Sequence, residues 1–253
     1  MSNAFDEAYF QRGDERGTQY RDYLQGAKGN RTYFEIAQTI AEVFRPKRAL
    51  EIGCAVGAIV SHLNAFDIEA HGIDVSEWAV ENKLHENVSV GSAETIPFDD
   101  GYFDVVYSVH ALEHLTPAIK DASLSEISRV CNGFQFHMLP ILESGPYVGD
   151  RFAHLLNLRT DPTHSLLFDK QWWTTQFSSL GWTDSELSLS ILHDNEFYEL
   201  SACQFVLCKT APESSVFKRA AQHNHAVAGA SWLALNGRPT CGLDVHVNRL
   251  KQA

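Results

Sequence analysis

The feature of this sequence that most constrains its fold is a short stretch in which an apolar strand runs into an acidic residue and two glycines, and then into a helix. The stretch reads Arg48-Ala-Leu-Glu-Ile-Gly-Cys-Ala-Val-Gly57. Gly53 and Gly57 permit a tight turn from strand to helix and a close approach of the backbone to a ligand, because neither has a Cβ. Glu51 stands at the end of the strand, where its carboxylate can accept hydrogen bonds. The pattern therefore predicts a nucleoside-binding corner in an α/β sheet.

The charge in this corner indicates which kind of nucleoside ligand fits. Its spacing is Glu51-x-Gly53-x-Ala55-x-Gly57, whereas dinucleotide sites more often read G-x-G-x-x-G and hold a pyrophosphate at the helix N-terminus. A carboxylate repels phosphate and attracts an amino group or a sulfonium. We therefore expect a cationic ligand, in contact with Glu51, Gly53, Cys54, Ala55 and Gly57. Taken alone the corner is weak evidence, because glycine turns after apolar strands are common in α/β proteins.

Three later segments repeat the arrangement of an apolar strand with polar residues at its end. Asp74 follows the second strand, where a carboxylate can bind both ribose hydroxyls. Because the carboxyl ends of parallel strands share one edge of a sheet, we expect all these residues in one pocket. The three segments are 69–76, 88–98 and 103–115, and the predicted pocket residues in them are Asp74, Val75, Ala93, Glu94, Ser108 and His110.

These ordered matches resemble motif I and the following motifs of the class I S-adenosylmethionine-dependent methyltransferases, over residues 30–140. The tripeptide E-H-L at 113–115 resembles a signature of the ubiquinone-biosynthesis-like subgroup, which acts on small molecules. The resemblance implies S-adenosylmethionine as the cofactor, with the loop of Ala93 and Glu94 packed along its adenine. It also implies that a lid tyrosine, here Tyr9, covers the cofactor or the acceptor, and that Glu113 and His114 order the loop below the methyl donor.

The order of the apolar segments predicts an α/β fold. Strands near 48–53, 70–74, 87–91, 103–108 and 133–139, separated by crossover helices, imply a doubly wound, mostly parallel, Rossmann-like sheet with helices on both faces. Late strands near 184–192 and 201–208 would complete seven strands as the antiparallel pair of this family. We expect helices at 31–44, at 169–181 with Asp169 as N-cap and Gly181 as its stop, and at 216–227, and a weak edge strand at 243–250.

The same pass along the chain divides it into three parts. Residues 1–30 mix aromatic and charged side chains and read as an N-terminal lid. Residues 31–210 form the methyltransferase domain, with an insertion at 141–168, after the fifth strand, on the acceptor side. Residues 211–253 form a C-terminal extension of unknown role.

Composition excludes several classes of protein. The chain has 253 residues, of which 44% are hydrophobic and 21% charged, as in ordinary globular proteins. Its formal net charge of −12 argues against a nucleic-acid-binding surface. No long apolar run or charged-then-apolar leader stands out, so we expect a cytoplasmic protein without a membrane partner, monomeric or homodimeric. The five cysteines are odd in number and widely spaced, so we expect neither a disulfide framework nor a zinc site.

Histidines near the predicted pocket are the candidates for catalysis. A general base would help methylation of a hydroxyl, and the unperturbed pKa of histidine, about 6.5, suits the task. His164 is the leading candidate, with Asp161 to orient its ring, and His110 is the second; His137 and His154 are further ones. His110, His114, His137 and Glu113 together suggest a divalent-metal site, but metal-dependent methyltransferases use carboxylate-rich sets, so we expect no metal.

The expected activity is methyl transfer to an oxygen, or else a nitrogen, of a small-molecule acceptor. The alternatives are an N-methyltransferase of a peptide or sugar intermediate and a noncatalytic cofactor-binding scaffold subunit. A nucleic-acid methyltransferase is disfavoured, because Ser108-Val-His-Ala111 stands where such enzymes carry N-P-P-Y or D-P-P-Y. A dinucleotide-dependent dehydrogenase is disfavoured by Glu51.

Overall fold

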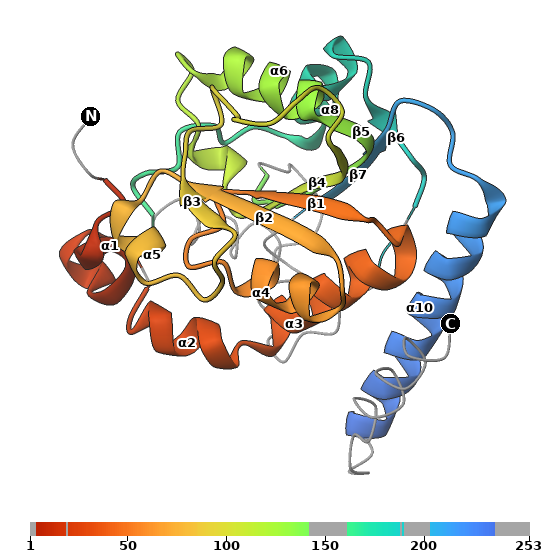
Figure 1. Ribbon diagram of the computed structural model, residues 1–253, viewed down its shortest axis with the longest axis horizontal. Helices are drawn as coiled ribbons and strands as arrows, with labels where there is room; N and C mark the ends of the chain where they lie inside the picture. The colour runs from red at the N-terminus through yellow and green to blue at the C-terminus, as the bar shows by residue number, and fades with distance from the viewer. Residues whose placement is uncertain (1–3, 19, 142–160, 188, 190–202, 236–253) are drawn as a thin grey trace.

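A seven-stranded sheet formed by the described residues is the centre of the molecule (Figure 1). The computed structural model describes residues 4–18, 20–141, 161–187, 189 and 203–235. The strand order is β3-β2-β1-β4-β5-β7-β6; the first five strands are parallel, and β7 runs antiparallel to both β5 and β6. The predicted mostly parallel Rossmann-like sheet is confirmed. The strands are β1 (Arg48–Ile52), β2 (Glu69–Asp74), β3 (Val88–Val90), β4 (Phe103–Val109), β5 (Cys131–Leu139), β6 (Thr183–Asp184) and β7 (Cys203–Cys208).

Helices cover both faces of the sheet, as Figure 1 shows. On one face α3, α4 and α10 bury one apolar cluster, to which Ile36, Leu63 and Val216 contribute. On the other, α6 and α8 bury a second cluster with Ile127 and Trp173. Strands buried on both faces need continuous apolar runs, which explains why β1 and β4 read as they do. The helical elements are α1 (Glu7–Gln11), η1 (Gly13–Glu15), α2 (Tyr23–Gly29), α3 (Arg31–Thr39), η2 (Ile40–Phe44), α4 (Ala58–Ala65), α5 (Glu77–Glu81), η3 (Leu112–His114), α6 (Lys120–Val130), α8 (Lys170–Ser179) and α10 (Ser214–Leu235).

The predicted helix boundaries at α3 and α8 have clear local causes. The Asn30 side chain accepts a hydrogen bond from the Thr32 amide and begins α3, which widens into a π turn, η2, before Pro46. The Asp169 carboxylate accepts one from the Trp172 amide, 2.7 Å away, and begins α8. Gly181, with φ of +80°, follows its end. A capping side chain at the start of a helix and a left-handed glycine after its end are the expected signals for helix boundaries.

The helix expected at 216–227 is present as the longer α10, which runs beside the domain (Figure 1). His223 fixes it, because its Nδ1 lies 2.7 Å from Oε2 of Glu42 and its Nε2 lies 3.1 Å from Oγ1 of Thr39. The Arg219 guanidinium donates to the Val43 carbonyl. The edge strand expected at 243–250, most of the insertion with His154, and residues 188 and 190–192 lie outside the described residues. Of the late strand expected at 184–192, the described part is shorter than predicted, since β6 ends at Asp184.

The N-terminal segment packs against the carboxyl ends of the strands. Asp6 caps α1 by accepting from the Tyr9 amide. Phe10 stacks on Trp78 of α5 with ring centroids 5.2 Å apart, and the Ser76 hydroxyl donates to the Phe5 carbonyl. The segment therefore reaches across to the turn after β2.

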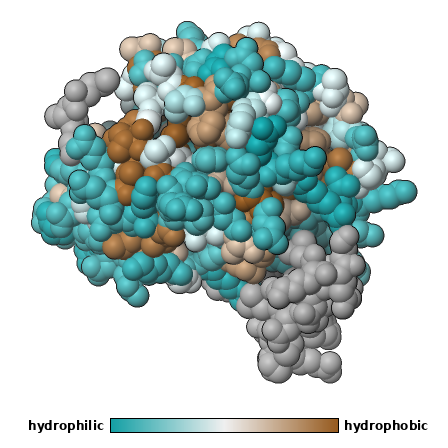
Figure 2. All heavy atoms as spheres, viewed as in Figure 1, coloured by the Kyte–Doolittle hydropathy of each residue, from teal (hydrophilic) through white to brown (hydrophobic). Residues whose placement is uncertain are grey.

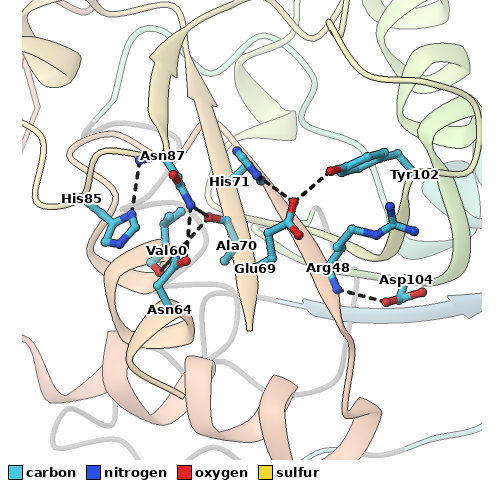
Figure 3. A network of polar contacts seen from close by, with 10 residues as sticks. All are labelled: Arg48, Val60, Asn64, Glu69, Ala70, His71, His85, Asn87, Tyr102 and Asp104. Carbon is cyan, nitrogen blue, oxygen red and sulfur yellow. Dashed lines mark hydrogen bonds and ion pairs between the residues drawn. The ribbon is translucent and has the colours of Figure 1, made fainter. Parts of the chain in front are cut away.

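Polar contacts tie together the opposite edge of the sheet, where the strands start (Figure 3). Oδ2 of Asp104 accepts from the Arg48 amide, and Oε1 of Glu69 accepts from the Tyr102 hydroxyl at 2.8 Å. The side-chain amide of Asn87 donates to the Ala70 carbonyl. These contacts fix the relative positions of β1, β2 and β4 at the edge away from the cavity described below. In the described part of the chain, no helix combines the length and apolar character needed to cross a bilayer.

Candidate active site

A cavity lies at the carboxyl ends of the strands, beneath the N-terminal segment. It encloses about 1000 Å³ of empty space, part of which opens to solvent. Concave sites with a mostly apolar wall and a few polar groups are where small ligands and cofactors usually bind. The predicted site residues on its wall are Tyr9, Gly53, Ala55, Asp74, Val75, Ala93 and His110.

The glycine turn shapes one side of this cavity. Gly53 has φ of +68°, and a Cβ there would lie 2.5 Å from the Cβ of Ala111. Gly57 has φ of +74°, and a Cβ there would lie 2.3 Å from Cγ2 of Val88. Both positions therefore require glycine for the backbone conformation and for the space. Gly57 does not line the cavity but allows α4 to pack against β3.

Asp74 braces the turn and faces the cavity. Its Oδ2 accepts from the Ala55 amide at 2.7 Å, and its Oδ1 accepts from the Ser76 amide at 2.8 Å. Burial raises the pKa of Asp74, and these backbone hydrogen bonds oppose the rise. Each carboxylate oxygen keeps a second lone pair, which a ribose hydroxyl can use.

Glu51 lies behind the cavity wall, with 3% of its surface exposed. The Tyr107 hydroxyl donates to its Oε2 at 3.2 Å. Burial raises the pKa of Glu51 well above its ordinary value, and the nearby Asp74 carboxylate adds to the rise, whereas the Tyr107 hydrogen bond opposes it. A cationic group brought close to Glu51 would therefore stabilise its ionised form, which burial disfavours in the free protein.

Three other predicted cofactor residues lie off the wall. Cys54 is buried, and its Sγ contacts the Ala55 carbonyl. Glu94 is half-buried and accepts from the Ser92 hydroxyl. Ser108 is fully buried and lies 2.8 Å from Nδ1 of His137.

The cavity has an apolar rim. The large hydrophobic side chains that are most exposed include Val75, after β2, and Val90, in β3, at 52% and 54%. Figure 2 shows hydrophobic surface gathered over α5 and β3, on this side of the molecule. Because Val75 also lines the cavity, this apolar surface continues into it.

His110 and Glu113 form a pair at the end of β4. His110 has a left-handed backbone, with φ of +51°, and lines the cavity. Its Nδ1 lies 3.4 Å from Oε1 of Glu113, which is long for a hydrogen bond, so the contact is mainly electrostatic. Burial favours a neutral Glu113, but His110, His114 and His164 together outweigh it and hold the pKa of Glu113 below its ordinary value. Glu113 is therefore a buried carboxylate among three imidazoles.

The residues of the Asp161-Pro-Thr-His164 segment connect this pair to the lid. The Tyr9 hydroxyl donates to Oδ2 of Asp161 at 2.7 Å, and the Thr163 hydroxyl donates to Oδ1 at 2.5 Å. Nε2 of His164 lies 3.9 Å from Oε1 of Glu113 and 4.0 Å from Oδ2 of Asp161. Burial works against charge on Asp161, yet the Thr163 and Tyr9 hydrogen bonds and the nearby His114 keep its pKa below its ordinary value. Asp161 thus holds the lid as well as lying near His164.

His137 takes part in the core. It is fully buried in β5, stacks on Phe177 and bonds to Ser108. Burial lowers its pKa to about 3, so the ring stays neutral. His137 is therefore a core residue, whereas His110 and His114 line the cavity.

Sequence reasoning missed part of the cavity wall. Tyr20, Tyr23 and Tyr33 line it, as does His114. The aromatic residues of the predicted lid indicated in general that rings such as Tyr20 and Tyr23 would cover the cavity. Tyr33, however, belongs to α3, and nothing in its spacing distinguishes it from a core residue.

Comparison with known proteins assigns this arrangement to a family. Residues 50–133, from β1 to the start of β5, match the family model described as "Methyltransferase domain". That span contains the glycine turn, Asp74 and the His110–Glu113 pair. Residues 50–133 therefore carry a methyltransferase domain, within a sheet that has the class I fold. The subgroup within class I stays a prediction.

Several relatives share this methyltransferase domain. Ajmaline N-methyltransferase of Rauvolfia serpentina is 34% identical over 97 residues, which cover 34% of this chain and 33% of that protein. The uncharacterized methyltransferase YcgJ of Bacillus subtilis is 28% identical over 170 residues, covering 63% of this chain and 66% of its own. The crystal structure of YcgJ superposes with a TM-score of 0.50 and 25% identity, over 60% of this chain and 69% of that one.

A further solved structure shares the fold. It is the 1,6-didemethyltoxoflavin-N1-methyltransferase of Burkholderia thailandensis with bound 1,6-didemethyltoxoflavin and S-adenosylhomocysteine, with a TM-score of 0.51, 13% identity and coverage of 70% of this chain and 78% of that chain. S-adenosylmethionine is the cofactor predicted from the sequence. The site fits it, because Gly53, Ala55 and Asp74 line the cavity and Asp74 offers hydroxyl-binding lone pairs.

Proposed function

We propose that the protein transfers a methyl group from S-adenosylmethionine to an oxygen, or else a nitrogen, of a small-molecule acceptor. The observation that carries this proposal is the single cavity that extends from the glycine turn and Asp74 to His110 and His114 beneath an aromatic lid. Two ligands bound at the two ends of one continuous cavity can come into contact, which methyl transfer requires.

The cofactor end of the cavity is the glycine turn. We infer that Gly53 gives close access to the backbone, Asp74 binds the ribose hydroxyls, and Glu51 attracts the amino group of the cofactor. Ala93 would pack along the adenine. When bound, S-adenosylmethionine supplies a methyl group activated by the sulfonium.

The acceptor end is enclosed by rings. Phe5, Tyr9, Phe10 and Tyr20 line the cavity from the N-terminal segment, and Tyr9 is only 3% exposed. Such a wall excludes water and leaves room for a small molecule rather than a polymer. The net charge of −12 agrees, because a nucleic-acid acceptor needs cationic contacts to its phosphates.

A proton acceptor is available at the wall. We propose His110 for this role, since this residue lines the cavity and the ionised Glu113 beside it would stabilise the imidazolium. His164 does not line the cavity and faces Glu113 and Asp161 instead, so it supports the pair rather than meeting the acceptor directly. Oxygen is favoured over nitrogen as the attacking atom because removal of a hydroxyl proton benefits from such a base.

The test is release of S-adenosylhomocysteine over a panel of small phenols, alcohols and amines. We expect turnover with a subset of hydroxyl compounds, and a fall of about 10²-fold or more in kcat for His110→Gln. His71→Gln, a partly exposed histidine that also pairs with a carboxylate, is the matched control and should retain full activity. Cofactor binding without turnover on any class of acceptor, including peptides and sugars, would favour the scaffold alternative, and a fully active His110→Gln would remove His110 as the base.

A further inference from the structure

A cluster of one buried carboxylate and two partly buried imidazoles lies beside the cavity, at residues Glu113, His114 and His164. We propose that this cluster binds a divalent transition-metal ion of the Zn²⁺ type, with an open coordination position directed to the acceptor. The role toward the acceptor rests on the proposed function, whereas the metal binding itself does not. The proposal departs from the sequence-based expectation of no metal: of the four residues considered there it keeps Glu113 and His114, leaves out His110 and His137, and adds His164.

The three side chains converge although 50 residues separate the second from the third. Glu113 and His114 lie in η3, directly after β4, and the backbone amides of Ser165 and Leu166 both donate to the Glu113 carbonyl, at 2.8 and 2.9 Å. These two bonds place His164 against η3. One potential ligand atom from each of the three residues lies within 4.8 Å of the others. Ligand atoms around tetrahedral zinc are about 3.3 Å apart. Side-chain rotations that move these atoms by roughly an ångström would therefore bring them into a zinc-binding geometry.

Glu113 is the observation that points to a missing cation. Its side chain is fully buried, and neither of its carboxylate oxygens has a hydrogen-bond partner. Nδ1 of His164 is likewise buried without one. Buried carboxylates are ordinarily paired, hydrogen-bonded or bound to a metal. Imidazoles at 3.4 and 3.9 Å stabilise the charge of Glu113 electrostatically but leave both of its oxygens without a good hydrogen bond.

The contacts behind His114 prepare it as a ligand. Thr163 donates its only hydroxyl proton to Asp161, so its oxygen must accept at the 2.8 Å contact with Nδ1 of His114. A neutral His114 therefore carries its proton on Nδ1 and keeps a lone pair on Nε2. Metal-binding histidines characteristically donate their second ring nitrogen to a fixed partner in this way. The chain of bonds continues to Tyr9, which also donates to Asp161, and so connects the cluster to the lid.

The donor set indicates the class of ion. Two imidazoles and one carboxylate suit zinc and neighbouring first-row metals, whereas magnesium and calcium prefer sets made of oxygen atoms alone. Three protein ligands leave a fourth position of zinc open. Because His114 lines the cavity, that position lies at the wall shared with the acceptor. An acceptor hydroxyl bound there would be oriented and would lose its proton more readily.

The experiment is titration of tag-free, full-length protein, first stripped with a chelator, with Zn²⁺ by calorimetry and with Co²⁺ by visible absorption. We expect one Zn²⁺ per chain and the absorption bands of tetrahedral or five-coordinate Co²⁺. Addition of azide should shift those bands, because a small anion can take the open position. Zinc binding that is absent or substoichiometric would overturn the proposal, and Co²⁺ bands that do not respond to azide would overturn the open position.

Variants assign the ion to this cluster. His164→Gln and Glu113→Gln should each weaken Zn²⁺ binding about 100-fold or more. His71→Gln should bind as the wild type does, since His71 pairs with Glu69 at the opposite edge of the sheet (Figure 3). If Glu113→Gln fails to fold, His164→Gln and His114→Gln decide the matter, with folding checked by circular dichroism. Undiminished Zn²⁺ affinity in the folded variants would overturn the assignment.

Binding of S-adenosylhomocysteine, measured on the same samples, separates this proposal from the proposed function. Absence of Zn²⁺ binding by the wild-type protein, with cofactor binding intact, would contradict the metal site alone. Metal binding without any cofactor binding would contradict the proposed function and leave the metal site in place.

Discussion

Replacing Glu51 by glutamine should stabilise the free protein and weaken its hold on the cofactor. Burial raises the pKa of Glu51 well above its ordinary value of 4.5, so the folded protein holds the charged form at a cost. Each unit of such a rise costs about 1.4 kcal/mol where the unfolded carboxyl would be ionised. In chains of this size about 1 kcal/mol changes Tm by 2–4 °C. We therefore expect Glu51→Gln to raise Tm by about 3–6 °C for each tenfold fall in the acidity of Glu51 that folding causes.

The sign of the pH dependence follows from the raised pKa. A carboxyl whose folded pKa is raised favours folding fully below its unfolded pKa, and this contribution is lost as the pH rises toward the folded pKa. The Tm difference between Glu51→Gln and wild type should therefore be largest at neutral and alkaline pH and shrink as the pH falls toward 4.5. The glutamine carbonyl can still accept from Tyr107, which keeps the comparison close to a change of charge alone.

The same variant should bind S-adenosylmethionine more weakly. Loss of a charged acceptor costs about 1.5–3 kcal/mol, or roughly a 10- to 150-fold rise in Kd. Thermal melts with and without cofactor, together with calorimetry, measure both effects. Glu69→Gln is the matched control: Glu69 is half-exposed, the Tyr102 hydroxyl lowers its pKa, and its loss should not stabilise the protein. A Glu51→Gln protein that melts lower than wild type, or that binds the cofactor equally well, would refute the reasoning.

Three further substitutions test the glycine turn, the lid and the terminal helix. Gly53→Ala should abolish cofactor binding and lower Tm, because a Cβ there meets a backbone φ of +68° and a 2.5 Å contact; calorimetry with retained affinity would contradict the close approach. Tyr9→Phe should leave Asp161 one donor short, at a cost of about 1–3 kcal/mol, and speed amide exchange in residues 5–18; unchanged exchange would show that this bond does not hold the lid. His223→Ala should lower Tm by several degrees through the lost contact with Glu42, an expected cost of about 1–3 kcal/mol, and a melt identical to wild type would mean that α10 is held by apolar packing.

The sheet was predictable because its evidence is local. Each of β1 to β4 is a short run that ends at, or just before, a polar residue or a glycine, so β1 and β2 could be located with Glu51 and Asp74 at their ends. The α8 boundaries followed from Asp169 and Gly181 for the same reason. Patterns of this kind depend on neighbours a few residues apart, which a single sequence displays.

The composition of the site was less predictable because its contacts join distant segments. The Tyr9 and Asp161 side chains are 152 residues apart, and His114 and Thr163 are 49 apart, yet each pair is hydrogen-bonded. The spacing of residues along the sequence does not indicate that such distant residues are in contact. The sequence placed His164 near the acceptor but could not show that it faces Glu113, whose burial depends on the packing of η3 against residues 161–166.

Calorimetric titration with S-adenosylmethionine and S-adenosylhomocysteine, and with NAD as the control, tests the central claim most directly. The account predicts that both sulfur nucleosides bind with micromolar or lower Kd, that NAD does not bind, and that Asp74→Ala raises both Kd values by roughly 10- to 150-fold. Absence of binding by both sulfur nucleosides, or equal binding of NAD, would contradict the assignment of the glycine turn and Asp74 as the cofactor site.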